Sequence, residues 1–176
     1  MKVLCYGDSN TYGYDPRSYY GGRYDAQYRW VDILASKTGW QIQNAGMNGR
    51  EIPRQSDLIP DGTELLIVML GTNDLLQGKC AEEACQRMES FLQNLDPEIV
   101  CLIAPPPMKP GEWVSSNALI GESKALSREY KALARRLGIR FLDAGGWNVE
   151  LTFDGVHFSE NGHIAFAEGL WKELVE

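Results

Sequence analysis

The stretch Val3-Leu4-Cys5-Tyr6-Gly7-Asp8-Ser9-Asn10 joins a short apolar run to a polar turn. The apolar residues predict a buried strand, and Ser9 follows two residues after that strand ends. Ligands of open α/β sheets bind in the crevice at the carboxyl ends of the strands, so a serine here is well placed for chemistry. Asp8, Ser9 and Asn10 are equally typical of an ordinary turn that caps the next element. These residues alone do not separate the two interpretations.

Similar apolar runs recur along the chain and alternate with longer helical patterns. The runs that predict strands lie at residues 3–6, 41–45, 65–70, 99–104 and 139–142. They are nearly continuous in apolar residues, which is typical of strands covered on both faces. Alternating strands and helices predict a parallel sheet between two helical layers. We therefore expect an α/β fold, a flavodoxin-like three-layer sandwich with a five-stranded parallel sheet, in a single domain over residues 1–176.

Apolar residues spaced three and four positions apart predict the helices of this sandwich. The predicted helices run from Trp30 to Gly39 and over residues 81–95, 119–137 and 164–174. Gly138 suits the C-cap of the third helix, and Ser159 suits the N-cap of the last.

The composition is that of an ordinary globular chain, with 44% hydrophobic and 23% charged residues among 176. The net charge of −7 argues against a nucleic-acid partner, because phosphate binding requires a clustered basic surface. Apolar runs stay well short of the ~20 residues that a membrane span requires, so we expect no membrane insertion. The strand pattern begins at Lys2 and leaves no room for a secretory signal. We therefore expect a cytoplasmic protein.

The cysteines give no sign of a metal or redox site. Cys5, Cys80, Cys85 and Cys101 form no C-x-x-C pair and have no histidine near them in sequence, which argues against zinc. Cys5 and Cys101 lie in apolar strand runs, where cysteine behaves as a small hydrophobe. We expect reduced cysteines, no metal and no cofactor.

Two connections are longer than the usual loop of ~4–6 residues. The first covers residues 11–25 and is rich in tyrosine and glycine, and the second covers 105–117 and holds Pro105-Pro106-Pro107 and Trp113. Both follow the carboxyl ends of strands, so we expect both to border the crevice next to Ser9. Surface packing or a subunit contact explains them equally well. The exposed aromatic surface of the first connection predicts a homo-oligomer.

Both histidines of the chain lie near its end. Asp154-Gly155-Val156-His157 places a carboxylate three residues before a histidine. A serine hydroxyl is a poor nucleophile unless a base takes its proton, and histidine with an oriented carboxylate suits that role. The D-x-x-H pattern alone is weak, and His163 is a rival base that we expect within the last helix.

Two glycine-containing turns offer hydrogen-bond donors for a developing oxyanion. Gly46 opens Gly46-Met47-Asn48-Gly49 after the strand at 41–45, and Gly71-Thr72-Asn73-Asp74 follows the strand at 65–70. Glycine lets a backbone N–H approach a substrate closely, and asparagine supplies a side-chain amide donor. Each turn alone is unremarkable, but such features after successive strands are difficult to explain as turns only.

Taken together, these segments resemble the SGNH hydrolases, also called GDSL esterases and lipases. Gly7-Asp8-Ser9-Asn10 is similar to the family's first block, and Gly46 within Asn44-Ala45-Gly46-Met47-Asn48-Gly49 to the second. Gly71-Thr72-Asn73-Asp74 resembles the third block, and Asp154-Gly155-Val156-His157 the last. The resemblance spans nearly the whole chain. Asn10 stands where the family name has leucine, at a position that varies in the family.

The resemblance implies roles for the matching residues. Ser9 would attack an ester carbonyl, His157 would act as general base and then acid, and Asp154 would orient His157. The oxyanion hole would be the backbone N–H groups of Ser9 and Gly46 with the side-chain amide of Asn73. Asp8 and Asp74 are interpreted as structural residues that hold their loops by hydrogen bonds.

The expected substrate is a small ester with a short acyl group, such as acetyl. The chain is compact, and the three consecutive prolines form a rigid turn that would crowd a long acyl chain. The segments around Ser9 and the prolines resemble the arylesterase and acyltransferase branch of the family, and an acetylated sugar is a further option because tyrosine and tryptophan stack on rings. The substrate-pocket candidates are Tyr12, Tyr14, Pro106, Met108, Trp113 and Val156.

Alternative functions remain open at this point. The chain could be a ligand-binding module without catalysis, or a lysophospholipase or thioesterase of the same family. A flavin- or nucleotide-binding protein is disfavoured because no G-x-G-x-x-G or P-loop pattern follows the first strand. Ser9 does not lie in a G-x-S-x-G elbow, which disfavours the α/β-hydrolase fold.

Overall fold

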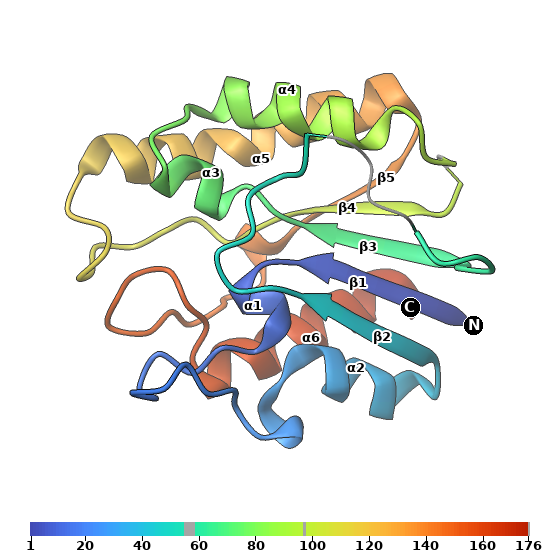
Figure 1. The fold of residues 1–176 in the computed structure, drawn as a ribbon, viewed down its shortest axis with the longest axis horizontal. Helices are drawn as coiled ribbons and strands as arrows, with labels where there is room; N and C mark the ends of the chain where they lie inside the picture. The colour runs from blue at the N-terminus through green and yellow to red at the C-terminus, as the bar shows by residue number, and fades with distance from the viewer. Residues whose placement is uncertain (55–58, 97, 176) are drawn as a thin grey trace.

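The computed structural model describes residues 1–54, 59–96 and 98–175 and contains one parallel sheet of five strands. The strands are β1 (Lys2–Gly7), β2 (Gln41–Gly46), β3 (Leu65–Met69), β4 (Val100–Ala104) and β5 (Arg140–Asp143). Their order across the sheet is β2-β1-β3-β4-β5, with every neighbouring pair parallel. The predicted five-stranded α/β fold is therefore confirmed (Figure 1).

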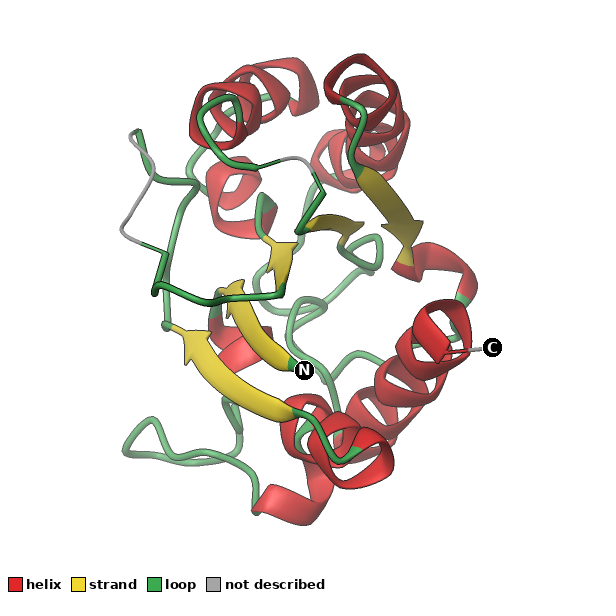
Figure 2. Cartoon of the chain, turned by 90° about the vertical axis from the view of Figure 1, so that its right-hand side faces the viewer, coloured by secondary structure: helices red, strands yellow, loops and turns green. Residues whose placement is uncertain are grey.

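Helices cover both faces of this sheet. The helices on one face are α3 (Thr72–Leu76), α4 (Ala81–Leu92) and α5 (Asn117–Leu137), and those on the other are α2 (Trp30–Thr38) and α6 (Glu160–Val175). Figure 2 shows the sheet between these two layers. Alternate residues of each strand point to opposite faces, so Leu4 and Tyr6 pack under α4 and α5, whereas Val3 and Cys5 pack against α2 and α6.

The helix ends follow local capping chemistry. Gly39 and Gly138 adopt the left-handed conformation with φ of 69° and 67° and end α2 and α5 as predicted. The Ser159 hydroxyl accepts a hydrogen bond from the Gly162 N–H at 3.0 Å, as expected of the N-cap before α6. α5 begins two residues before the prediction, because Ser116 caps it by accepting from the Ala118 N–H at 3.2 Å.

The strand predictions are wrong in one respect at the sheet edge. β2 forms one edge of the sheet, and Gln41 and Gln43 are exposed, so this strand is not covered on both faces. Its sequence alternates polar and apolar residues, which is typical of a strand with one wet face. At the opposite edge, β5 begins at Arg140, one residue later than predicted.

Two short helices follow directly on strand ends, where the sequence analysis predicted turns. α1 (Ser9–Tyr12) follows β1, and α3 follows β3. The connection after β1 runs along one face of the sheet and the connection after β3 along the other (Figure 1). The chain therefore adds strands in one direction from β1 to β2 and in the other direction from β3 onward, so β1 and β3 flank a topological switch point. In open α/β sheets, ligands bind at the carboxyl edge next to such a switch point.

Within the described part of the chain, each helix falls short of the combination of length and hydropathy that a membrane-crossing helix needs.

Candidate active site

Ser9 lies where β1 ends and α1 begins. Gly7 is the last residue of the strand, and a Cβ there would lie only 2.1 Å from Thr11 Oγ1, so the chain can turn this closely only with glycine. Asp8 caps α1 by accepting a hydrogen bond from the Asn10 N–H at 3.0 Å. Ser9 is consequently held at the first position of the helix, at the carboxyl edge of the sheet, and is 6% exposed.

His157 and Asp154 come from the loop before α6 and meet Ser9 at this edge. His157 Nε2 lies 3.0 Å from Ser9 Oγ, and His157 Nδ1 lies 2.7 Å from Asp154 Oδ2. All three side chains are buried. When Nδ1–H donates to Asp154, Nε2 is free to accept the Ser9 proton, which is the arrangement that an activated serine requires. The structure thus brings together the three residues that the sequence analysis grouped.

The loop keeps its shape because the Asp154 carboxylate binds the loop's own backbone. Its Oδ1 accepts hydrogen bonds from the N–H groups of Val156 at 2.8 Å and His157 at 2.9 Å. Burial raises the pKa of Asp154, but the hydrogen bonds from the His157 ring and from these two N–H groups outweigh it and lower the pKa from 3.8 to about 2. Asp154 is therefore ionised at neutral pH and can stabilise a positive charge on the His157 ring.

The connection after β4 supports this loop from outside. The Lys109 N–H donates to Gly155 O at 3.0 Å, and the Trp113 N–H donates to Asp154 O at 3.1 Å. A Cβ on Gly111 would lie 2.3 Å from the Asp154 carbonyl carbon. The two segments are packed backbone against backbone, so the proline-rich connection borders the site as predicted.

Two of the six substrate-pocket candidates contact the His157 ring. The ring centroids of Tyr14 and Trp113 lie 4.7 Å and 5.0 Å from that of His157. Tyr14 is fixed by its N–H, which donates to Ser9 O at 3.0 Å, and Trp113 is 53% exposed. Tyr12 is half-buried and stacks instead under the Arg23 guanidinium, 4.3 Å from its ring centroid.

The other three candidates lie in or beside the core. Met108 and Val156 are 3% and 4% exposed and belong to the core cluster under α4 and α5. Pro106 borders a hollow of about 380 Å³ whose lining includes Met108 and Lys124 but neither Ser9 nor His157. Apolar side chains on a loop gain more from burial in the nearest core than from facing a wet crevice. These contacts give no support to the prediction that the three line the substrate pocket.

Gly46, the first predicted oxyanion donor outside the nucleophile turn, ends β2 against α1. A Cβ here would lie 2.1 Å from the Tyr12 nitrogen, so the close approach depends on glycine. Its N–H donates to Asn44 Oδ1 at 2.9 Å, and Asn44 Nδ2 in turn donates to Thr11 O at 2.8 Å. The Gly46 N–H thus has an internal acceptor, which the sequence analysis did not foresee.

Asn73, the second predicted donor, lies in the first turn of α3. Its Nδ2 donates to Arg50 O at 3.0 Å, and an amide nitrogen carries a second hydrogen. The Arg50 guanidinium donates to Gly7 O at 3.1 Å and to Ala45 O and stacks 4.1 Å from the Tyr6 ring centroid. Arg50 therefore ties the ends of β1 and β2 to the helix that carries Asn73.

Asp8 precedes the nucleophile in sequence and is 2% exposed. Burial raises its pKa from 3.8 to about 6, although the Asn10 N–H and the charges of His157 and Arg50 act in the opposite direction. Its capping bond to α1 agrees with the predicted structural role.

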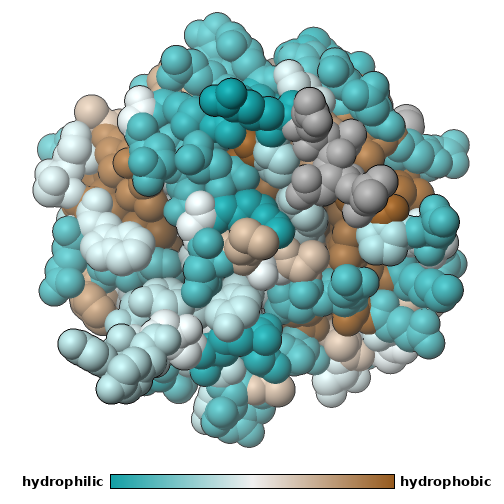
Figure 3. All heavy atoms as spheres, in the orientation of Figure 1, coloured by the Kyte–Doolittle hydropathy of each residue, from teal (hydrophilic) through white to brown (hydrophobic). Residues whose placement is uncertain are grey.

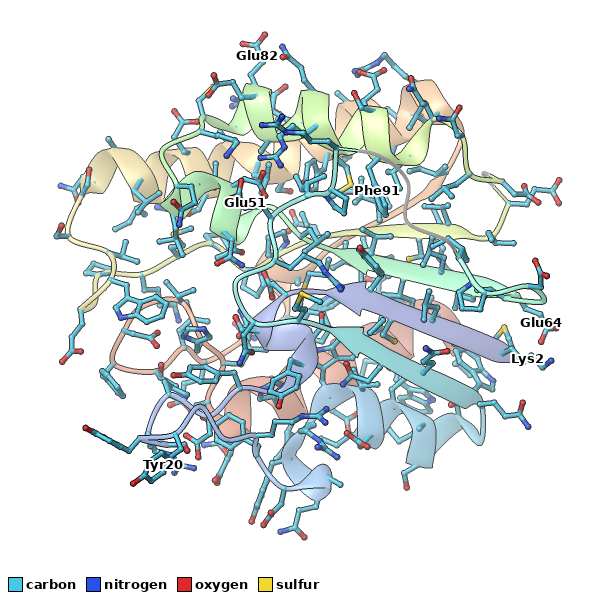
Figure 4. The ribbon with its side chains drawn as sticks, viewed as in Figure 1. Lys2, Tyr20, Glu51, Glu64, Glu82 and Phe91 are labelled. Atoms are coloured by element: carbon cyan, nitrogen blue, oxygen red, sulfur yellow. The ribbon has the colours of Figure 1, made fainter. Side chains whose placement is uncertain are left out.

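Asp74 is fully buried and holds the segment after β2. It accepts from the Ile52 N–H at 2.9 Å and pairs with Arg87 at 2.8 Å. Arg87 also pairs at 2.7 Å with Glu51, which lies below α4 in Figure 4. Burial raises the Asp74 pKa. This carboxylate therefore serves loop structure, as predicted.

His163 lies in α6, away from the nucleophile's partners. It is fully buried, and its ring packs on those of Tyr24 and Phe158 with centroids 5.3 Å and 5.2 Å away. Its Nδ1 lies 3.5 Å from the backbone nitrogen of Trp30. Burial lowers its pKa to about 3. A neutral histidine in the core is the simpler interpretation of this residue, and His157 is the one that contacts Ser9.

The tyrosine-rich connection forms a small hairpin, with Tyr14 bridged to Arg23. At its tip Tyr19 and Tyr20 are each 93% exposed and pack edge to face, and Tyr20 points away from the body of the molecule (Figure 4). The surface over this segment is pale, of intermediate hydropathy, in Figure 3. Homo-oligomerisation through this surface stays a prediction.

Sequence reasoning missed three polar residues that shape the site. Asn44 and Arg50 accept hydrogen bonds from Gly46 and Asn73, the two predicted oxyanion donors. Asn10 binds the loop of His157 through hydrogen bonds to Val156 O at 3.2 Å and from the Phe158 N–H at 2.9 Å. The sequence carries one signal for Asn10: it is a polar residue directly after the nucleophile, at the position where the name of the resembling family has leucine.

The described residues contain no group of three or more His, Cys, Asp or Glu side chains arranged to hold a metal ion.

A sequence model of the GDSL-like lipase/acylhydrolase family matches residues 5–165. A search of curated proteins gave no match. The matched segment includes Ser9, Gly46, Asn73, Asp154 and His157, and it therefore contains every residue of the site described above.

Solved structures resemble the whole chain. A "putative arylesterase" from Agrobacterium tumefaciens str. C58 is 28% identical, with 99% of this chain and 98% of that chain covered and a TM-score of 0.83. Est24, a carbohydrate acetylesterase from Sinorhizobium meliloti, is 24% identical with the same coverage and a TM-score of 0.82. The aryl esterase of M. smegmatis is 23% identical, again with 99% and 98% covered, and has a TM-score of 0.80. The last two similarities bear on the fold alone.

Proposed function

The chain belongs to the GDSL-like lipase/acylhydrolase family and is a carboxylic ester hydrolase, and from that premise we propose that it forms an acyl-enzyme on Ser9. The observation that carries the proposal is the continuous chain from Ser9 Oγ through His157 to Asp154, with contacts of 3.0 Å and 2.7 Å. The roles of Ser9, His157 and Asp154 in the two steps below rest on that geometry.

In the acylation step, Ser9 Oγ attacks the ester carbonyl while His157 Nε2 takes the hydroxyl proton. The ring then carries a positive charge, which the ionised Asp154 stabilises through Nδ1–H. Collapse of the tetrahedral intermediate breaks the bond to the alcohol, and His157 gives its proton to the leaving oxygen. The products of this step are a free alcohol and an ester between the acyl group and Ser9.

In the deacylation step, water takes the place of the alcohol. His157 removes a proton from the water, the hydroxide attacks the acyl-enzyme, and Ser9 leaves after receiving the proton back from His157. The carboxylic acid is released and the free enzyme is restored. Another alcohol in place of water would receive the acyl group by the same route.

The oxyanion would accept hydrogen bonds from the Ser9 N–H, the Gly46 N–H and the Asn73 amide. Ser9 is the first residue of α1, and the first N–H groups of a helix lack an intrahelical acceptor. Asn73 has a second amide hydrogen beyond the one given to Arg50 O. Gly46 would exchange Asn44 Oδ1 for the oxyanion, and a charged acceptor forms the stronger bond.

We assign the alcohol half of the substrate to the aromatic side of the site. His157 Nε2 protonates the leaving oxygen, so the alcohol must lie next to the rings of Tyr14 and Trp113, which flank His157. Aromatic side chains bind planar or ring-shaped groups by stacking. An aryl alcohol or a sugar therefore suits this side, and the arylesterase name of the Agrobacterium relative agrees with the first option.

The acyl half is proposed to be short, such as acetyl. Each described helix of eight or more residues packs along a face of the sheet, which leaves the carboxyl edge to loops and to the short helices α1 and α3. A long acyl chain would need apolar cover beyond these elements.

The test is a rate comparison on p-nitrophenyl acetate, butyrate and decanoate with wild type and two serine variants. Ser9→Ala should lower kcat/KM by about 10⁴-fold or more. The matched control is Ser90→Ala, at an exposed position of α4, where the hydroxyl donates to Gln86 O at 3.1 Å; this variant should keep wild-type rates. Acetate should be the best substrate. Retained activity in Ser9→Ala would refute the mechanism, and a preference for decanoate would refute the short acyl group.

The aryl assignment has its own test with phenyl acetate and ethyl acetate. Wild type should favour the phenyl ester beyond its greater intrinsic reactivity. Trp113→Ala should remove a large part of that preference by raising KM for the phenyl ester. An unchanged ratio of the two kcat/KM values in Trp113→Ala would count against this assignment.

A further inference from the structure

Asn10 bonds to the backbone on both sides of His157. Its Oδ1 accepts from the Phe158 N–H at 2.9 Å, and its Nδ2 donates to Val156 O at 3.2 Å. The orientation of the amide is fixed by chemistry, because a peptide N–H can only donate and a carbonyl can only accept. Asn10 is 4% exposed, so both bonds are shielded from water.

The same residue is anchored on the nucleophile side. Asn10 follows Ser9 directly in α1, its N–H is bound by Asp8, and its C=O accepts from Trp30 Nε1 at 2.9 Å. Trp30 is 1% exposed in the core between the sheet and α6. The backbone and the side chain of Asn10 therefore join the helix of the nucleophile to the loop of the base, which are separated by 148 positions in sequence.

Asp154 cannot supply this link by itself. It fixes the His157 ring and the N–H groups of Val156 and His157, and all of these contacts lie within three residues of it. A loop that is rigid internally can still move as a unit relative to Ser9. Asn10 ties that unit to α1.

From this geometry we infer that Asn10 is a positioning residue that sets the distance between Ser9 Oγ and His157 Nε2. This inference rests on the proposed function. Leucine, the residue in the family's name for this position, could fill the space but could make neither hydrogen bond. Position 10 in this chain thus contributes to the alignment of the base, and its effect should be visible in kcat rather than in KM.

The first test compares Asn10→Leu with wild type on p-nitrophenyl acetate. A misplacement of ~1 Å between reacting groups can cost ~10²-fold in rate, so kcat should fall by about 10- to 100-fold, with KM changed by less than about twofold. The rate of fluorophosphonate labelling should fall in parallel, because it uses the same Ser9–His157 pair.

Tyr24→Phe is the matched control. The Tyr24 hydroxyl donates to Phe158 O at 3.2 Å, so this variant also removes a hydrogen bond from the N-terminal segment to the same loop. The two Asn10 bonds on either side of His157 remain in this variant, so kcat should stay within about threefold of wild type. An equal loss of kcat in Tyr24→Phe and Asn10→Leu, or no loss in Asn10→Leu, would overturn the inference.

A third variant decides the question even if Asn10→Leu fails to fold. In Asn10→Asp, a carboxylate faces Val156 O and lacks the donor, whereas a protonated carboxyl group supplies both the donor and the acceptor. The ratio of variant to wild-type kcat should therefore rise as the pH falls from 8 to 5. Wild type measured at each pH is the reference, so the pH dependence of the shared residues enters both terms of the ratio.

A pH-independent ratio would overturn the inference. Ser9→Ala measured in parallel separates the two levels of the account. If Ser9→Ala is inactive and the Asn10 variants behave as wild type, the positioning role alone is wrong. If Ser9→Ala is active, the proposed function itself fails.

Discussion

The two halves of the candidate site, which meet at Ser9, differ in how complete they are without substrate. On the base side, His157 already contacts Ser9 Oγ and Asp154, and the surrounding backbone is bound by Asp154 and Asn10. On the oxyanion side, the Gly46 N–H is bound to Asn44 Oδ1, and one hydrogen of the Asn73 amide is bound to Arg50 O.

The difference reflects what each half has to bind. His157 must be aligned with Ser9 before the substrate binds, whereas an oxyanion exists only in the tetrahedral intermediate. Polar groups in a folded protein rarely stay without a partner, so internal acceptors occupy the donors between turnovers. A neutral ester carbonyl competes weakly with Asn44 Oδ1 and a charged oxyanion competes strongly. Such an exchange would favour the transition state over the bound substrate, as catalysis requires.

The largest effect should come from the base half. Asp154→Asn should lower kcat by about 10⁴-fold, because an amide in place of the carboxylate favours the wrong tautomer of His157 and cannot stabilise the imidazolium. Steady-state rates on p-nitrophenyl acetate measure this loss. A loss below about tenfold would mean that the contact between Asp154 and His157 serves structure alone.

A smaller loss is expected when an oxyanion donor is removed. Asn73→Ala should lower kcat by about 10²- to 10³-fold with little change in KM, because the bond forms only in the transition state. Gln77→Ala, in the residue that follows α3, is the control and should keep wild-type kcat, which separates the loss of the donor from damage to this region. A rise in KM at constant kcat would show that Asn73 binds substrate in the ground state.

The exchange at Gly46 predicts a difference between two variants at Asn44. Asn44→Ala removes the competing acceptor and should change kcat by less than about threefold. The variant should also lose about 1 kcal/mol of stability, because its bond to Thr11 O is removed. Asn44→Asp should lower kcat by about tenfold or more, because a carboxylate holds the N–H more strongly and repels the oxyanion. Equal kcat values for the two variants would argue against a role for Gly46.

Ionisation of two buried carboxylates should change the stability of the fold in opposite directions. The pKa of Asp154 is lowered to about 2 by its hydrogen bonds, so its contribution of about 2 kcal/mol is present above pH 4 and is lost as the pH falls toward 2. The pKa of Asp8 is raised to about 6 by burial, so ionisation of Asp8 destabilises the fold by about 3 kcal/mol as the pH rises from 4 to 7.

Asp8→Asn isolates the second effect. The variant keeps an acceptor for the Asn10 N–H and should be more stable than wild type at pH 7 but not at pH 4. Denaturant unfolding across this range measures the difference. Parallel stability curves for the two proteins between pH 4 and 7 would show that Asp8 is not destabilised by its burial.

The fold was predictable because buried strands and helix ends have sequence patterns that span only a few residues. The apolar runs of β1, β3 and β4 and the capping glycines Gly39 and Gly138 follow from rules that act over a few residues. β2 was wrongly predicted to be covered on both faces, because sequence does not show which strand lies at a sheet edge. α1 and α3 were predicted as turns because Asn and Asp are poor helix formers, and capping and packing override that preference.

The site was predictable in part. Ser9 was predictable because it closely follows β1, and Asp154 and His157, in the loop before α6, were predictable because their spacing matches the last block of the resembling family. Asn10, Asn44 and Arg50 escaped prediction because they bind backbone groups that only the folded chain brings near. The assignment of Met108 and Val156 to the pocket stays a prediction, because an apolar residue on a loop can serve either the core or a pocket and sequence does not separate the two.

Covalent labelling with a fluorophosphonate, followed by peptide mass mapping, shows whether Ser9 is the nucleophile. We expect one adduct per chain, on the peptide that contains Ser9, and no adduct in Ser9→Ala. An adduct on a different residue, or a chain that hydrolyses p-nitrophenyl acetate without being labelled at Ser9, would contradict this expectation.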